Sequence, residues 1–111
     1  MENLVFLELV KRGLRPNLDL FYYKTRNGRE VDFVVKNGLE IDELIQACYE
    51  TTNPEVEQRE IKALLETTQE LKPKKLTILT WDEKKEIEKE GKIIQWKPLW
   101  EWLLENTNYN G

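Results

Sequence analysis

The chain has 111 residues and a net charge of −4, with no histidine and a single cysteine. This length fits one domain, residues 1–111, and is too short for two. Without histidine the usual zinc sites are excluded, so any metal would need oxygen ligands, as Mg²⁺ does. No apolar run approaches the roughly 20 residues that cross a membrane, and no signal-peptide pattern occurs, so we expect a cytoplasmic domain without membrane contact.

The acidic balance argues against a broad nucleic-acid-binding surface, because phosphate binding depends on clustered Lys and Arg. Local basic clusters can still make weak contact with nucleic acid. The sequence has two of them: Lys11, Arg12 and Arg15 in one, and Lys24, Arg26 and Arg29 in the other.

The first half of the chain predicts a short helix followed by a three-stranded meander. Residues 2–12 carry apolar side chains at mixed helical spacing and are followed by Gly13. Residues 18–25 and 29–36 are rich in aromatic and β-branched side chains and flank an Arg-Asn-Gly turn, which is typical of an antiparallel hairpin. An Asn-Gly pair then leads into a third strand at residues 40–49.

The second half predicts a long helix, two further strands and a closing helix. The long helix covers residues 51–71, where Thr, Asn and Pro suit its first turn. Residues 75–80 read as a buried strand, and the crossover helix makes this strand parallel to the third. A charged stretch leads to a strand at residues 92–96, a helix at residues 98–104 and a frayed tail at residues 106–111.

These elements predict an α/β domain with a mixed sheet, in which an antiparallel three-strand meander and two further strands are flanked by helices. Because side chains alternate across a strand, two sets should each share one face. The sets are Glu30, Asp32 and Val34 on the second strand, and Leu44, Gln46 and Cys48 on the third. We therefore expect Asp32 and Gln46 to face each other.

Several segments, taken in order, resemble one family. They are ENLVFLELVKRG, FYYKTRNGREVDFVV, LIQACYE, REIKALLE, LTILTWDE and IIQWKPLWEWLL, which together cover nearly the whole chain. This set resembles the DUF4143-like C-terminal domain of unknown function that follows an AAA+ ATPase module in many prokaryotic proteins. The resemblance implies a restriction-endonuclease-like core of the PD-(D/E)xK superfamily, with an ATPase module of the same or another chain as partner.

In PD-(D/E)xK nucleases an Asp and a downstream acid-x-Lys hold Mg²⁺ and activate water, often with a Glu from the first helix. By resemblance, Asp32 matches the metal-binding Asp and Glu8 matches the helix Glu. Gln46 stands at the position of the second acid and Cys48 at that of the lysine. The site is therefore expected to be degenerate, with Asp32 and Gln46 binding Mg²⁺ only if a site survives. Without a histidine base, the cysteine is expected to be a small buried apolar side chain.

Two alternatives remain open at these positions. Asp42 or Glu43 can serve as the second acid, although Glu43 and Gln46 would point to opposite faces of the strand. Asp32 can instead be a structural carboxylate, held by neighbouring backbone or by Arg29 without any metal.

Three hypotheses of function follow. The first is a catalytically degenerate nuclease-like domain that binds or regulates an AAA+ ATPase, needs no cofactor and makes at most weak contact with nucleic acid. The second is an active Mg²⁺-dependent nuclease that uses Glu8, Asp32 and Gln46. The third is a homodimerising interaction domain. Trp100 and Trp102 cannot both face inward on one helix, so one of them is a candidate for an interface.

Overall fold

The computed structural model describes residues 1–105 and 108–109, so most of the predicted tail at residues 106–111 lies outside the described part of the chain. The described part contains three helices and six strands. In chain order they are α1 (Glu2–Lys11), β1 (Leu20–Lys24), β2 (Glu30–Asn37), β3 (Glu40–Ala47), α2 (Pro54–Leu71), β4 (Lys75–Thr80), β5 (Lys85–Lys89), β6 (Lys92–Pro98) and α3 (Leu99–Leu103). None of these described helices is long and apolar enough to cross a membrane.

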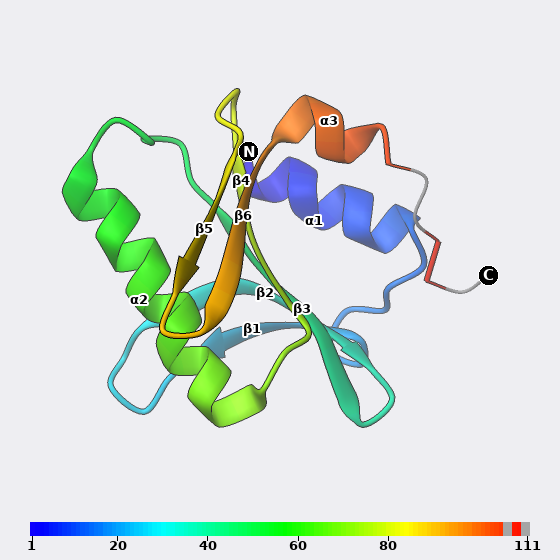
Figure 1. The fold of residues 1–111 in the computed structure, drawn as a ribbon. Coiled ribbons are helices and arrows are strands. Elements are labelled where there is room, and N and C mark those ends of the chain that lie inside the picture. The colour runs from blue at the N-terminus through cyan, green and yellow to red at the C-terminus, as the bar shows by residue number, and fades with distance from the viewer. Residues whose placement is uncertain (106–107, 110–111) are drawn as a thin grey trace.

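The strands form one six-stranded mixed sheet in the order β1-β2-β3-β4-β6-β5 (Figure 1). β1, β2 and β3 pair antiparallel in chain order, which confirms the predicted meander. β4 pairs parallel with β3, because α2 carries the chain back across the sheet between these two strands. β4 also pairs parallel with β6, because β5 runs in the opposite direction between them in the sequence. The predicted α/β class, with a mixed sheet and flanking helices, is confirmed.

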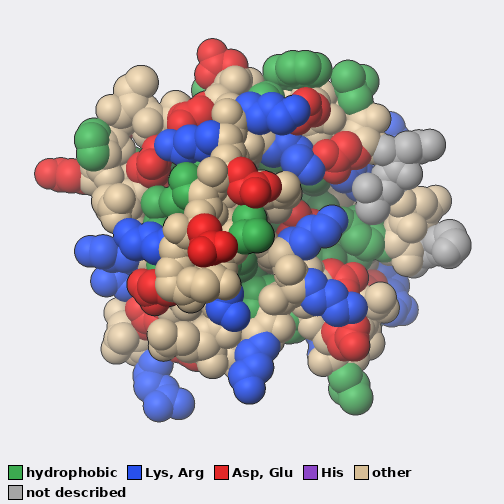
Figure 2. Space-filling view, in the orientation of Figure 1, with side chains coloured by type: hydrophobic (Ala, Val, Ile, Leu, Met, Phe, Trp, Pro, Cys, Tyr) green, Lys and Arg blue, Asp and Glu red, His purple; other side chains and the backbone are tan. Residues whose placement is uncertain are grey.

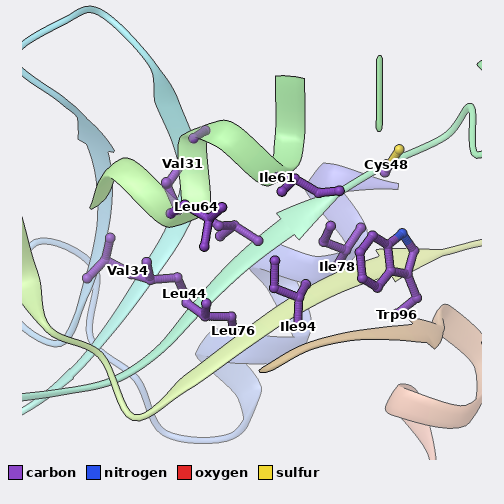
Figure 3. Close-up of a cluster of buried hydrophobic side chains, with 12 residues drawn as sticks. Val31, Val34, Leu44, Cys48, Ile61, Leu64, Leu76, Ile78, Ile94 and Trp96 are labelled. Carbon is purple, nitrogen blue, oxygen red and sulfur yellow. The ribbon is translucent and has the colours of Figure 1, made fainter. Parts of the chain in front are cut away.

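Helices cover both faces of the sheet, with α2 on one face and α1 and α3 on the other (Figure 1). Each face has its own buried core. On the α2 side, Ile61 and Leu64 pack with Trp96 of β6 (Figure 3). On the opposite side, Val5 of α1 packs in a second core with Trp102 of α3. β4 is buried along nearly its whole length between these cores, as expected for a central strand that is covered on both faces.

The ends of α2 follow local chemistry. Asn53 is the N-cap, and its side-chain oxygen accepts hydrogen bonds from the backbone N–H groups of Glu55 and Val56 at 3.0 and 3.5 Å. Pro54 occupies the first turn, where its missing N–H costs nothing. At the other end, Lys72 adopts a left-handed conformation with φ of 53° and closes the helix. The helix therefore runs nearly as the sequence predicts.

The sixth strand, β5, comes from a stretch that the sequence predicts only as charged, just before Gly91. Half-buried Lys85, Ile87 and Lys89 alternate with exposed glutamates along it. The ammonium group of Lys85 lies 4.8 Å from the centre of the Trp96 ring, and Ile87 packs against the α2-side core. The inner face of this edge strand is formed largely by the aliphatic parts of lysine side chains, so its sequence has no clear alternation of apolar and polar residues. The predicted number of strands, five, is therefore corrected to six.

β2 is irregular where Asp32 lies. The two-residue step from Phe21 to Tyr23 of β1 pairs with a three-residue step from Val34 to Val31 of β2, as in a β-bulge. Val31 and Val34 consequently both lie in the α2-side core. The prediction of strict alternation along this strand, which would put Asp32 and Val34 on one face, is therefore wrong over these residues.

Candidate functional site

Asp32 of β2 and Gln46 of β3 take part in three hydrogen bonds between the two strands, which we call the Asp32–Gln46 clasp. Oε1 of Gln46 accepts from the backbone N–H of Asp32 at 2.8 Å, and its Nε2 donates to the backbone carbonyl of Glu30 at 2.9 Å. The Asp32 carboxylate accepts from the backbone N–H of Ala47 at 2.8 Å. The structure confirms that Asp32 and Gln46 face each other, although their side chains bind backbone and not one another.

The Gln46 amide acts as a peptide group in this clasp. It accepts one hydrogen bond from the β2 backbone and donates another to it, and the residue is only 1 % exposed. A carboxylate at this position would have no N–H to offer to the Glu30 carbonyl. A buried carbonyl that loses its donor costs about 1–3 kcal/mol. Both ends of the Gln46 amide are therefore committed to strand pairing.

Cys48 lies in the α2-side core (Figure 3). It shares this core with Leu44, as the alternation of the third strand predicts. Burial raises the pKa of the Cys48 thiol above its ordinary value. A buried neutral thiol supplies no positive charge and is a poor nucleophile. The prediction of a small buried apolar side chain is confirmed.

The Asp32 carboxyl group titrates near neutral pH. Burial, followed by a hydrogen bond with the Glu2 carboxyl group, raises the pKa of Asp32 from 3.8 to about 7, and the charge of Glu60 adds to the shift. The Ala47 N–H acts in the opposite direction because it stabilises the ionised form. Acids from α1 and α2 therefore surround this carboxyl group and favour its protonated form.

Glu8 does not take the place that the resemblance implies. Its carboxylate binds Nε of Arg12, the residue that follows α1, at 2.8 Å. The Arg12 guanidinium lies 4.3 Å from the centre of the Trp102 ring. The acid of α1 that approaches Asp32 is Glu2, in the first turn. Of these two glutamates, Glu2 and not Glu8 lies beside Asp32. The apolar side chains of α1 lie on both its buried and its exposed face. Their spacing in the sequence therefore does not reveal which acid of the helix faces the sheet.

Glu43, the rival second acid, lies in a different part of the fold. Its carboxylate accepts a hydrogen bond from the Thr77 hydroxyl group, and burial raises the pKa of Glu43. It lines a hollow of about 210 Å³ with Lys97 and Trp102, next to α3. Asp32 lines two other hollows, so Glu43 and Asp32 do not form one site.

One arginine from each predicted basic cluster is paired with an acid. Arg29 binds Glu66 of α2 at 2.9 Å. The Asp32 carboxylate is held by the backbone N–H of Ala47, which is one of the two structural roles expected for Asp32. Arg15 binds Asp19 at 2.8 Å in the same way. Figure 2 shows blue and red side chains mixed over one face of the molecule. This mixture gives that face little attraction for a phosphate backbone.

The donor set does not fit a magnesium ion. Mg²⁺ requires near-ideal octahedral oxygen coordination and is usually held by one or two ionised carboxylates. Gln46 carries no charge, and its Oε1 already accepts a backbone hydrogen bond. Across residues 1–105 and 108–109, no three His, Cys, Asp or Glu side chains come together as a metal-binding group.

Comparison with known proteins places this arrangement in a family. The model of a domain of unknown function, DUF4143, matches residues 1–102. The chain belongs to the DUF4143 family. This DUF4143 chain is 42 % identical, over 110 residues, to an uncharacterised protein of Methanocaldococcus jannaschii. The match covers 94 % of the chain but only 24 % of that relative, so the DUF4143 chain spans about a quarter of the relative's length. No solved structure matches it.

The clasp predicts that Gln46→Glu destabilises this DUF4143 domain. The new carboxylate would be buried, would leave the Glu30 carbonyl without its donor and would add a negative charge next to Asp32. We expect a loss of about 2–4 kcal/mol in the free energy of unfolding at pH 8. Urea unfolding measures this loss, and the exposed α2 variant Gln58→Glu serves as the control, with a change within about 0.5 kcal/mol. Equal effects of the two substitutions would contradict the clasp.

The raised pKa of Asp32 predicts a pH-dependent stability. Because the folded state holds the proton up to about pH 7 and the unfolded state releases it near 3.8, wild-type stability falls as the pH rises between these values. Asp32→Asn keeps an oxygen for the Ala47 N–H and cannot ionise. Relative to wild type, this variant should gain about 1–3 kcal/mol between pH 4 and pH 8.

Urea unfolding at these two pH values tests the effect of Asp32→Asn. Asp82→Asn removes an exposed acid as the matched control and should follow the wild-type pH profile. A wild-type profile for Asp32→Asn as well would mean that the Asp32 carboxyl group titrates like an exposed one.

Proposed function

We propose that this domain is a catalytically inactive relative of PD-(D/E)xK nucleases that serves as a binding or regulatory module of a cytoplasmic prokaryotic AAA+ ATPase. The observation that carries the first part is the commitment of Gln46 to the clasp. The residue at the position of the second metal-binding acid is neutral, buried and bonded to backbone at both ends of its amide.

Loss of catalysis follows from the chemistry that remains. Hydrolysis of a phosphodiester by this superfamily needs a hard cation to polarise the phosphate and to lower the pKa of the attacking water. Gln46 supplies no second ionised carboxylate for such a cation, and Cys48 offers no ammonium group to orient the water. Two of the three central groups are thus unsuited to the reaction.

The outer face of α1 supports the role in binding. Val5 and Leu9 of this helix are fully buried against the sheet, whereas Leu4, Leu7 and Val10 are exposed by 46 %, 55 % and 37 %. A helix that is apolar on both its inner and outer faces is typical of one that is covered on both. The archaeal relative is about four times as long as this chain, which leaves ample length for an ATPase module that would cover α1.

A specific observation also favours self-association as a second candidate. Trp102 is 2 % exposed and packs in the core, whereas Trp100 on the same helix is 57 % exposed. The prediction that these two tryptophans face different ways is confirmed. Leu104 is 77 % exposed, and hydrophobic side chains are visible over α3 at the upper edge of Figure 2. An exposed aromatic anchor of this kind is common in protein interfaces.

The inactive-nuclease proposal predicts no Asp32-dependent cleavage of nucleic acid. Plasmid DNA and single-stranded DNA and RNA are incubated with Mg²⁺ or Mn²⁺ and with wild-type or Asp32→Asn protein purified in parallel. Any residual cutting should be equal in the two preparations, because it would come from a contaminant. Cutting by wild type that Asp32→Asn abolishes would establish the active-nuclease alternative.

The ATPase proposal is tested with the archaeal relative from which the matched quarter has been deleted. We expect this remainder to hydrolyse ATP, and we expect the added chain to change the rate in a saturable manner. Leu7→Lys should weaken the effect by about tenfold or more, because it places a charge in the contact. Leu39→Lys, at the fully exposed tip between β2 and β3, is the matched control and should behave as wild type.

Two results would contradict the ATPase proposal. One is a remainder that does not hydrolyse ATP, or whose rate the chain leaves unchanged. The other is a dimer, seen by light scattering, that Trp100→Lys dissociates. This result would favour the self-association candidate.

A further inference from the structure

A groove of about 550 Å³ runs between the first turns of α1 and the outer strands β1 and β2. Asp32 of the clasp forms part of its wall. The residues that line it are Glu2, Asn3, Phe6, Tyr22, Glu30, Asp32 and Phe33. Three of these side chains are carboxylic acids and three are aromatic, and the described lining includes no lysine or arginine.

The acids of the groove come from two elements that are distant in the sequence, α1 and β2. Glu2 is brought to Asp32 by the start of α1, where the Glu2 backbone N–H also donates to the Tyr49 hydroxyl group at 3.1 Å. Glu30 belongs to the same strand as Asp32, and its backbone carbonyl is held by Gln46. The clasp therefore holds this part of the groove wall in place, and the negative charge of the groove comes from two separate elements.

The aromatic side chains give the groove a second kind of contact. Tyr22 is 56 % exposed, and its hydroxyl group forms a hydrogen bond with Glu30 that raises the pKa of Tyr22. Phe6 and Phe33 line the same groove from α1 and β2. Aromatic faces attract cations through their electron-rich rings, and the guanidinium group of arginine also stacks on them as a flat plane.

We infer that this groove binds an arginine side chain of a protein partner. A guanidinium group would place its N–H donors on Glu2, Glu30 and Asp32 and its flat face on an aromatic ring. The inference rests on the proposed loss of catalysis, since it gives the former nuclease surface a protein ligand in place of a metal and a phosphate.

Two competing ligands fit the groove less well. A phosphate group would meet three acids with no lining cation to offset their charge. Mg²⁺ would find no compact set of ionised oxygen ligands, since no three metal-binding side chains converge within the described residues. A large, flat cation that combines hydrogen bonding with stacking matches both the shape and the chemistry of the lining.

The test is a titration of the ¹⁵N-labelled full chain with N-acetyl-arginine amide, followed by the backbone amide signals in NMR spectra. The uncharged isostere N-acetyl-citrulline amide is the matched control ligand. We expect saturable shifts that are strongest at the amides of the groove residues with the arginine derivative, and none with the citrulline derivative. Shifts of equal size with both ligands, or none with either, would overturn the inference.

Matched variants separate the groove from general attraction to an acidic protein. At pH 8, where the Asp32 carboxyl group is ionised, Asp32→Asn and Glu30→Gln each remove one charge from the groove and should each weaken binding about fivefold. Glu88→Gln removes one exposed charge from β5, at the opposite edge of the sheet, and should leave the affinity unchanged. Equal weakening by all three substitutions would overturn the assignment to the groove.

The two proposals fail in distinguishable ways. A chain that shows no Asp32-dependent cleavage and ignores the arginine derivative contradicts only the present inference. A chain that cuts nucleic acid in an Asp32-dependent way contradicts the proposed loss of catalysis, whatever its affinity for arginine.

Discussion

The arrangement at the centre of this domain depends on one side-chain amide. Gln46 replaces a stretch of backbone pairing between β2 and β3, because it accepts from the Asp32 N–H and donates to the Glu30 carbonyl. The regular pairing of β2 with β3 ends at Phe33 opposite Ile45, so the β2 backbone groups before Phe33 need other partners. A side-chain amide supplies both the donor and the acceptor that they need, whereas an ionised glutamate supplies acceptors alone.

The raised pKa of Asp32 in the same region follows from its burial and from the acids around it. Glu2 and Glu60 approach Asp32 from two helices on opposite faces of the sheet, whereas the nearest arginine of the turn, Arg29, is bound to Glu66. The carboxyl group of Asp32 therefore keeps its proton to about pH 7. A nuclease centre needs the reverse arrangement, with ionised carboxylates balanced by a metal ion and a lysine.

Most of the fold could be predicted from the sequence, because strong local signals coincide with the tertiary structure. Turn chemistry fixes the β1–β2–β3 meander, and Asn53 with Pro54 starts the helix that makes β4 parallel to β3. β5 escapes prediction because lysine stems form its inner face. At the site, the antiparallel pairing of β2 with β3 brings Asp32 opposite Gln46. The bulge, the clasp and the approach of Glu2 depend on long-range packing that no local pattern encodes.

The most direct test of the central claim is whether a divalent cation binds beside the clasp. Mn²⁺ broadens the NMR signals of nearby amides, so a titration of the labelled chain at pH 8 reports binding at Asp32 and Ala47 without reference to any reaction. We expect the wild-type chain to show no more saturable broadening at these two amides than Asp32→Asn shows. Saturable broadening in wild type that Asp32→Asn removes would mean that the metal centre survives and that Gln46 does more than hold two strands together.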